Sequence, residues 1–540
     1  MFAAFAGGIG YALARRSHRL TSRLPARKVA AAVGVAAAAA YTLLAGAEVP
    51  AVRTFAMLAI AACGLWLGRP GTAGIVWLWA LAGVLAWDPW APLTPGFWLS
   101  YGAVALLLFA GVGRLRPPPA RTWRGRLAHA IAEGAHAQWV VTVGLTPLTL
   151  ALFLQMSLIA PAANAVAIPA VTLVVVPLAL TGIVVPLPIF FELAHAALTP
   201  LMHFLEALAA LPDATWQQHA PPPWTVLAGC AGSLWLLAPR AVPGRALGLL
   251  WIAPIALVRP AALPADAFRL TMLDVGQGLA VVVQTRQHTL VYDTGAQFTE
   301  TADAGNRIIA PYLRATGRRR ADGLVVSHQD LDHSGGALSL LRATPVGWFA
   351  SSLPADHAIV AQARSNHVAI TCLAGQSWTW DGVRFDVLHP TVFEYADPHT
   401  KTNDRSCVVR VASPYGSALL TGDIEARSEA VLEASQRGRL RADVLVVPHH
   451  GSRTSSTPTF IRAVSPSIAL VACGYRNRFA HPRPEIVARY TGRGIAVART
   501  DYEGALSVVF DGRPLAVERA RAARGRYWLD APDREAGPLD

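Results

Sequence analysis

Acidic residues are almost absent from the first half of the chain, and this constrains the fold more than any other feature of the sequence. Before Arg259 they are Glu48, Asp88, Glu133, Glu192, Glu206 and Asp213. The background of Ala, Leu, Val, Ile, Trp, Gly and Pro is one that a water-soluble domain does not need. After Pro264 the chain holds most of its 34 acidic residues. The sequence therefore predicts two domains, a membrane domain over residues 1–262 and a soluble domain over residues 263–540.

Ten apolar runs in the first half reach or approach the length that crosses about 30 Å of hydrocarbon. They cover residues 1–14, 29–47, 52–68, 73–90, 97–113, 138–154, 165–186, 189–211, 224–239 and 246–258. We therefore expect a polytopic, multi-pass α-helical domain that contacts lipids in the inner (cell) membrane. Because the chain opens on an apolar run and its basic residues come afterwards, we expect no cleavable signal peptide.

Basic loops predict the orientation of this domain, because Lys and Arg near the ends of membrane spans tend to stay in the cytoplasm. Three such loops hold Arg15, Arg16, Arg19, Arg23, Arg27 and Lys28, then Arg69, then Arg114, Arg116, Arg121, Arg124 and Arg126. Pro212–Trp224 has no Lys or Arg and suits the outer side, whereas Arg240 and Arg245 suit the inner side. If the run 189–211 crosses the membrane, the soluble domain lies on the periplasmic or external face.

Two features of the membrane half leave room for a role beyond anchoring. A polar stripe at helical spacing consists of Glu192, His195, His203 and Glu206. The segment that carries it could instead lie flat on the interface or line an aqueous cavity, and the soluble domain would then be cytoplasmic. The apolar stretch 156–186 is interrupted by Pro161, Asn164, Pro169 and Pro177. Broken helices are tolerated where they face protein or water, so a pathway for a polar substrate and simple helix kinks are both open interpretations.

Net charge and cysteine spacing say little about function. The formal charge of +13 fits Arg-rich loops beside membrane spans as well as it fits nucleic-acid binding. The five cysteines are Cys63, Cys230, Cys372, Cys407 and Cys473. Their odd number and the absence of any CxxC spacing predict neither a disulfide framework nor a zinc ribbon, and the redox compartment stays open.

The most informative segment of the soluble half is His328–Gly336, directly after a predicted strand over 323–327. His328, Asp330, Asp332 and His333 fall within six residues, and two glycines let the backbone turn beneath them. Two carboxylates and two imidazoles this close together would repel or stay half-satisfied without a cation. The pattern therefore predicts a metal site.

Further candidate ligands follow three later predicted strands. Asp423 follows the apolar run 418–422 and is a carboxylate able to bridge two metals, while His449 and His450 follow the run 444–448. His481 comes after the strand 468–473 and a polar loop. Since each candidate lies at or beyond the carboxyl end of a strand, separate strands could aim all of them into one cleft.

This pattern resembles the metallo-β-lactamase superfamily, and the chain as a whole resembles the ComEC family of competence proteins. In the soluble half the resemblance is carried by Leu273–Gly278, Tyr292–Gly295, His328–Gly336, Asn403–Ser406, Thr421–Asp423, His449–Ser452 and Arg499–Asp501 before Gly504. In the membrane half it is carried by Gly46–Met57, Pro95–Val104 and Asn164–Pro169. The resemblance implies an αββα metallo-β-lactamase-like sandwich after the membrane domain.

The resemblance also implies roles for the site residues. His328 and Asp330 would bind one divalent ion, and Asp332 and His333 a second, with Asp423 as the bridge. His481 would complete the second ion's ligands, Asp293 would orient a ligand, and His449 or His450 would bind metal or contact the scissile phosphate. We expect Asp332, His449 and His450 to be catalytic in a two-metal phosphodiester hydrolysis.

One departure from the superfamily pattern bears on the metal. The usual loop reads His-x-His-x-Asp-His, and Asp330 stands here at its second His. A carboxylate makes the site harder and more tolerant of manganese or magnesium, with zinc still open. We therefore expect two divalent ions, manganese or zinc.

The function that the resemblance implies is DNA uptake in natural transformation. The membrane half would pass single-stranded DNA and the nuclease half would degrade the other strand, together with other competence machinery, and homodimerisation stays open. Candidate contacts to the strand are Ser452, Arg453, Arg476 and Arg478. Since family members usually begin with extra spans and an external oligonucleotide-binding-like domain, we expect a fragment or a short-start version.

Three alternatives remain. A membrane-tethered phosphodiesterase would act on nucleotides or lipids without transport. A zinc β-lactam or thioester hydrolase is disfavoured by Asp330 and by the many apolar runs. A domain that only binds DNA would need no metal and show no turnover.

Overall fold

The computed structural model describes residues 2–47, 49–68, 72–112, 122–366 and 368–526. The chain divides into two compact units, Met1–Arg259 and Pro260–Asp540, against a predicted boundary after residue 262. We call them the helical unit and the sandwich unit. Of the predicted basic-loop and acidic residues, Glu48, Arg69, Arg114, Arg116 and Arg121 lie outside the described residues.

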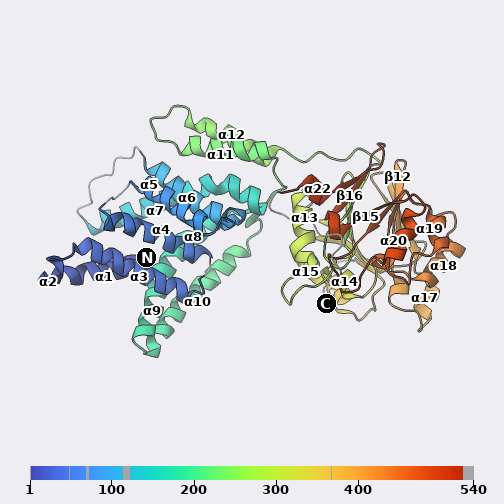
Figure 1. Cartoon of the computed structure of the whole chain (residues 1–540), viewed down its shortest axis with the longest axis horizontal. Helices are drawn as coiled ribbons and strands as arrows, with labels where there is room; N and C mark the ends of the chain where they lie inside the picture. Colours follow the sequence, from blue (N-terminus) through green and yellow to red (C-terminus); the bar gives the residue numbers. More distant parts are fainter. Residues whose placement is uncertain (1, 48, 69–71, 113–121, 367, 527–540) are drawn as a thin grey trace. The chain divides into compact units, whose positions relative to one another are not determined.

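The helical unit is built from apolar helices, and a helix covers most or all of each predicted apolar run (Figure 1). They are α1 Phe2–Arg16, α2 His18–Thr21, α3 Ala26–Leu44, α4 Val49–Trp66, α5 Ala73–Trp87, α6 Pro95–Gly111, α7 Trp123–Phe153, α8 Ala160–Ala170, α9 Val176–Val184, α10 Pro188–Ala209, α11 Pro223–Leu237 and α12 Gly248–Leu257. Among the described residues, four segments are long and apolar enough to cross a membrane, namely Ala26–Leu44, Trp123–Phe153, Ala160–Val184 and Pro188–Ala209. The expectation of a membrane protein thus rests on helix length and composition.

The prolines of the stretch 156–186 distort a helix more than they break it. Pro161 lies in the first turn of α8, where a missing N–H removes no helical hydrogen bond, whereas Pro177 lies inside the continuous helical segment Ala160–Val184, where it does remove one. Pro169 is inside α8, and the π-helical turn Val171–Val175 follows it. Such turns absorb the hydrogen bond that proline cannot donate. On α10 the polar stripe of Glu192, His195, His203 and Glu206 is exposed.

The sandwich unit holds two mixed sheets. The eight-stranded sheet has the order β17-β16-β3-β4-β5-β6-β7-β8 and the seven-stranded sheet the order β15-β14-β13-β12-β11-β10-β9. The bounds in the first are β3 Phe268–Met272, β4 Val281–Gln284, β5 Thr289–Tyr292, β6 Ala321–Val326, β7 Val346–Ser351, β8 Val368–Thr371, β16 Leu506–Phe510 and β17 Val517–Arg519. In the second they are β9 Ser377–Trp380, β10 Val383–His389, β11 Val408–Ser413, β12 Gly416–Leu420, β13 Val444–Val446, β14 Ile468–Val471 and β15 Ala496–Arg499.

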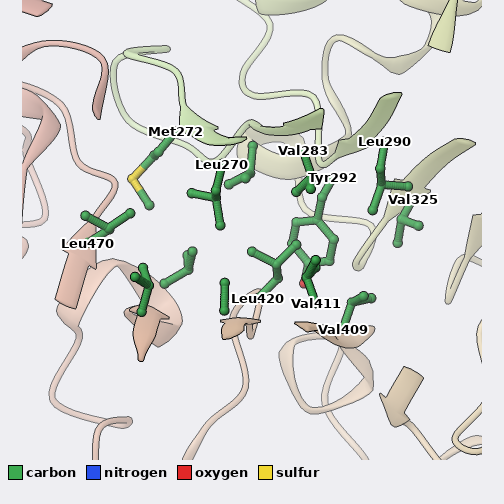
Figure 2. Packing of buried hydrophobic residues seen from close by; sticks show 14 of the residues in the cluster. Leu270, Met272, Val283, Leu290, Tyr292, Val325, Val409, Val411, Leu420 and Leu470 are labelled. Atoms are coloured by element: carbon green, nitrogen blue, oxygen red, sulfur yellow. The ribbon is translucent and has the colours of Figure 1, made fainter. Parts of the chain in front are cut away.

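The two sheets pack face to face through buried aliphatic side chains. Figure 2 shows Leu270, Met272 and Val283 of one sheet directed toward Val411 and Leu420 of the other, and all five are at most 1% exposed. Because side chains alternate along a strand, the neighbouring residues point outward into two further cores beneath helices.

Helices cover both outer faces of the sandwich. α13 Ala310–Ala315, α15 Ala337–Ala343 and α16 Ala358–Asn366 pack on the eight-stranded sheet. α18 Ala426–Ser435, α19 Pro458–Val464 and α20 Pro484–Thr491 pack on the seven-stranded sheet. The predicted αββα sandwich after a helical domain is confirmed.

Parallel pairing aligns the strand ends that carry the candidate ligands. β12, β13 and β14 are parallel neighbours, so their carboxyl ends meet at one edge of their sheet. β6, in the other sheet, is joined to the start of β11 by a hydrogen bond from the Cys407 N–H to the Ser327 carbonyl, 3.0 Å long. This edge is where the polar loops converge.

One prediction about cysteine was wrong. Cys372, just after β8, and Cys407, just before β11, form a disulfide with a Cα–Cα distance of 6.0 Å. Their 35-residue separation carries no recognisable spacing, because strands of two different sheets bring the pair together. The disulfide therefore links the two sheets close to the ligand-bearing edge.

Candidate metal centre

Each candidate ligand is held by a loop or short turn beyond a strand. His328 lies two residues after β6, and the short helix α14 Leu331–Ser334 carries Asp332 and His333. Asp423 follows β12, and His450 follows β13 in a turn where His449 and His450 both have positive φ, 52° and 53°. Positive φ is costly for non-glycine residues, so the fold holds these two side chains in a strained turn that directs them.

Four of the predicted residues form one group. Asp332, His333, Asp423 and His450 each offer a ligand atom, and these atoms lie within 4.8 Å of one another. His333 Nε2 lies 3.1 Å from both Asp423 Oδ1 and His450 Nε2. His450 Nε2 lies 3.3 Å from Asp332 Oδ2 and 3.5 Å from Asp423 Oδ2. We call these residues the four-ligand group.

The hydrogen bonds of the two imidazoles fix which ring nitrogens face the group. His450 Nδ1 donates to the carbonyl oxygen of Ala472 at 2.9 Å, and His333 Nδ1 donates to Asp293 Oδ2 at 2.8 Å. In neutral rings both Nε2 atoms then carry lone pairs, and these lone pairs face each other beside two carboxylates. Such an arrangement is repulsive unless a proton or a cation lies between them.

Unpartnered buried atoms around the group fit a divalent cation. His328 Nε2 and His481 Nδ1 are buried without a hydrogen-bond partner, and the buried Asp423 Oδ1 has the 3.1 Å contact with His333 Nε2. Buried polar atoms are rarely left unsatisfied, since each costs free energy comparable to a lost hydrogen bond. Imidazole nitrogens with carboxylate oxygens are the donor set of zinc and manganese sites. The residues present therefore fit a divalent metal ion.

Charge coupling within the group supports the same interpretation. Burial by itself would raise the pKa of Asp423, but the neighbouring His333 and His450 hold it well below its usual range. Burial alone would likewise lower the pKa of His333, yet Asp423 and Asp293 raise it well above the ordinary value. Protons on the imidazoles thus supply the positive charge that a metal ion would otherwise bring.

His328 and Asp330 lie next to the group without joining it. His328 Nδ1 lies 3.0 Å from Ser327 Oγ, and its Nε2 is 3.7 Å from Asp330 Oδ2. The Asp330 side chain is 44% exposed and accepts a hydrogen bond from Thr402 Oγ1 at 3.3 Å. The two are close enough to act together, and Asp330 is the solvent-facing member.

His449 lies near Asp423, and His481 lies near His449. His449 Nε2 is 3.9 Å from Asp423 Oδ2, and the His449 and His481 ring centroids are 5.9 Å apart. Burial, together with the neighbouring His450 and His449, lowers the pKa of His481 to about 4. His481 is therefore neutral near pH 7, as a metal ligand or a proton acceptor must be.

Most of the residues that were predicted to contact a DNA strand instead contact other residues of the protein. Arg453 pairs with Glu485, and the Arg478 guanidinium lies 4.8 Å from the centre of the Phe479 ring. Ser452 is 8% exposed, with its hydroxyl 3.3 Å from Thr454 Oγ1. Arg476 has a positive φ of 52° in the loop before His481. Within the described part of the chain, no hydrogen bond or ion pair joins Arg453 or Arg478 to the four-ligand group.

Two serines to which the sequence analysis gave no role organise the site. The Ser327 backbone N–H and hydroxyl donate to the two oxygens of Asp293, at 2.6 and 2.7 Å. Ser406 Oγ accepts from the Asp423 N–H at 3.1 Å and lies 3.4 Å from His328 Nδ1. In the sequence, Ser327 directly precedes the first histidine of the loop, and Ser406 ends the segment Asn403–Ser406 that carries the family resemblance.

A glycine turn supports the backbone of Asp332. Leu279 N–H donates to the Asp332 carbonyl at 3.0 Å, and Gly278 has φ +143°. A Cβ at Gly278 would overlap the carbonyl oxygen of Asp332. Only glycine fits at this close approach of two backbones.

Comparisons with known proteins find similarity in both units. A family model described as "Competence protein" matches residues 2–243, and one described as "Metallo-beta-lactamase superfamily" matches residues 273–475. The chain is 37% identical over 524 residues to Competence protein ComA of Neisseria gonorrhoeae, covering 96% of this chain and 71% of that protein.

Two further relatives extend the similarity. The chain is 34% identical over 496 residues to the uncharacterised protein YcaI of Escherichia coli (strain K12), covering 89% of this chain and 62% of that protein. It is 30% identical over 262 residues to ComE operon protein 3 of Bacillus subtilis (strain 168), covering 45% of this chain and 33% of that protein. The chain thus spans only part of the length of each relative.

Proposed function

The chain belongs to the ComEC family of competence proteins, and from this premise we propose that it takes up DNA in natural transformation. The helical unit passes a single strand, and the sandwich unit is a metal-dependent nuclease that degrades the strand left outside. The name of one relative, Competence protein ComA, and the family model described as "Competence protein" support DNA uptake as the process. The nuclease and conduit roles are our assignments to this chain.

The observation that carries the nuclease assignment is the pair of opposed imidazole nitrogens. His333 Nε2 and His450 Nε2 lie 3.1 Å apart beside Asp423 and Asp332, with both rings held by hydrogen bonds on Nδ1. A divalent ion bound there would act as a Lewis acid on a phosphodiester and would make water more acidic. A second ion would be held by His328 and Asp330 together with Asp423.

The chain's own residues have distinct tasks in this proposal. Asp293 fixes the tautomer and orientation of His333, since its carboxylate accepts the Nδ1 proton. His449 has a side chain that is 20% exposed, whereas those of His333 and His450 are almost fully buried. Burial lowers the pKa of His449, so it is neutral near pH 7 and can accept a proton or contact a phosphate oxygen.

The disulfide supports an external position for the sandwich unit. Disulfides persist in oxidising compartments and are rare in the cytosol. The Cys372–Cys407 pair therefore favours the periplasmic or external face, as the basic loops do. A topology reporter placed after Asp266 should give an external signal, and a cytoplasmic signal would rule out a nuclease that meets incoming DNA outside.

Hydrolysis of labelled single-stranded DNA by the purified full chain tests the nuclease. We expect cleavage with manganese or zinc, no cleavage after chelation, and a loss of at least about 100-fold in His333→Ala and His450→Ala. His399→Ala, a change at an exposed histidine, is the matched control and should keep full activity. Hydrolysis of a small phosphodiester without DNA cleavage would instead support a tethered phosphodiesterase, and metal-independent DNA binding without turnover would support a binding domain.

A further inference from the structure

The helical unit buries an arginine whose guanidinium has two nitrogens without a hydrogen-bond partner. Arg53, on α4, is 5% exposed, and its Nε and Nη1 atoms are buried without a hydrogen-bond partner. Among the residues that the structure describes, no carboxylate forms an ion pair with it. An unpaired guanidinium inside a membrane-type helix bundle is costly, so such residues generally serve a ligand or a pathway.

The guanidinium points at the start of another helix. A Cβ on Gly96 would lie 3.0 Å from Arg53 Nη2 and 3.4 Å from Nη1, so Gly96 leaves the space that the guanidinium needs. Gly96 lies in the first turn of α6, a 17-residue helix that begins at Pro95 and has no side-chain cap. In this first turn Pro95 has no N–H and the Phe97 N–H donates to the Thr94 carbonyl at 3.1 Å, so the Gly96 N–H and the positive end of the helix dipole remain to face the guanidinium.

Two positive groups thus lie close together beside a buried apolar cluster. Phe97 and Tyr101 belong to this cluster, each 3% exposed, with ring centroids 4.9 Å apart. The Tyr101 hydroxyl is already used, because it donates to the Ala80 carbonyl at 3.2 Å. A guanidinium beside a helix N-terminus repels it unless an anion joins them, and this pairing is a recurrent way to hold phosphate.

We propose that Arg53 and the first turn of α6 bind a phosphodiester group of a nucleic-acid strand in the helical unit. The choice of a DNA strand rests on the proposed function, whereas the anion site itself rests on the geometry. A lipid headgroup carries the same phosphate chemistry, and the lipid arm of the experiment separates it from a nucleic-acid strand. Two segments of the family resemblance, 46–57 and 95–104, meet at this point.

The test is binding of fluorescent single-stranded oligothymidylate to the full chain in phosphatidylcholine nanodiscs, with chelator present so that no strand is cut. Arg53→Gln should weaken binding about tenfold and reduce the slope of log affinity against log salt by about 0.7, the value for one lost phosphate contact. An uncharged methylphosphonate strand should bind Arg53→Gln and the parent equally. Because cleavage is not measured, failure of the nuclease assignment leaves this result untouched.

Matched variants separate charge from folding. Arg126→Gln removes the same charge from an exposed position and should leave affinity unchanged. Gly96→Ala keeps every charge but crowds Arg53, so it should also weaken binding and carries the test if Arg53→Gln fails to fold. Unchanged affinity in a folded Arg53→Gln or Gly96→Ala protein would overturn the proposal, as would an equal loss in Arg126→Gln.

Two further results would reassign the anion. Suppose that phosphatidylglycerol nanodiscs stabilise the parent protein but not Arg53→Gln, while both proteins bind DNA with the same affinity. The site then holds a lipid, and the nucleic-acid proposal is wrong. If Glu48→Gln reproduces the loss seen in Arg53→Gln, the guanidinium serves an internal ion pair and the proposal is equally wrong.

Discussion

Asp293 Oδ2 accepts a hydrogen bond from His333 Nδ1 at 2.8 Å, and both side chains are fully buried. The carboxylate therefore sets which nitrogen of His333 can face a metal. Asp293→Asn should weaken metal binding about 10- to 100-fold, because an amide neither carries the charge nor fixes the tautomer as strongly. Metal titration by calorimetry measures this effect. Asp443→Asn, the same change at an exposed residue, should bind metal as the parent does, and equal affinity in both variants would contradict the role of Asp293.

Gly278→Ala should destabilise the sandwich unit by about 2 to 4 kcal/mol and weaken metal binding, because the new Cβ overlaps the Asp332 carbonyl at a φ of +143°. Gly276→Ala in the same loop is the control, with φ +73° and open space around the added Cβ. Gly276→Ala should lower the unfolding free energy by only about 1 to 2 kcal/mol and leave the metal affinity unchanged. Chemical denaturation and metal titration read out both effects, and equal losses in the two variants would show that Asp332 is not the target.

Reduction of the Cys372–Cys407 disulfide should lower the unfolding free energy of the sandwich unit by about 3 to 4 kcal/mol, the loop-closure value for the 35-residue separation. The double variant Cys372→Ala, Cys407→Ala should have similarly low stability with and without reductant. Denaturation curves in the presence and absence of dithiothreitol measure this. A parent protein that is insensitive to reductant would mean that the pair is not oxidised in solution.

Asp381 should make stability depend on pH in acid. It accepts hydrogen bonds from Thr285 Oγ1 at 2.6 Å and from the Gln287 N–H at 2.7 Å. Burial works to raise its pKa, but these bonds and His288 outweigh burial and lower the pKa to about 2.

A folded-state pKa below the unfolded value stabilises the protein above pH of about 4, and that stability is lost as pH falls toward 2. The unfolding free energy of Asp381→Asn should therefore be about 1 to 2 kcal/mol lower than that of the parent at pH 6 and nearly the same near pH 2. Urea denaturation across this range measures the effect, with Asp356→Asn as an exposed control. A constant difference at every pH would assign the loss to packing.

Sequence patterns predicted the strands and most candidate ligands because the two signals coincide in this fold. An apolar strand that ends on His or Asp marks both a buried element and a site residue, as with β6 before His328 and β12 before Asp423. The helices of the first half could be predicted equally well, since apolar composition alone predicts them.

Other features were not accessible from one sequence. The partnership of Cys372 with Cys407 depends on how two sheets stack, which no spacing encodes. Whether His449 or His450 enters the four-ligand group depends on two successive positive φ values. The confinement of Arg53 beside Gly96 depends on the packing of α4 near the start of α6, which periodicity does not predict.

The candidate ligands stand in loops and short turns beyond the strands, while the strands themselves fill the cores between and beneath the sheets. Folding and metal chemistry are therefore carried by different sets of residues. A change of side chain at a loop position such as Asp330 should therefore leave both cores intact, whereas a cavity in a core strand should disturb every side chain that the strand positions.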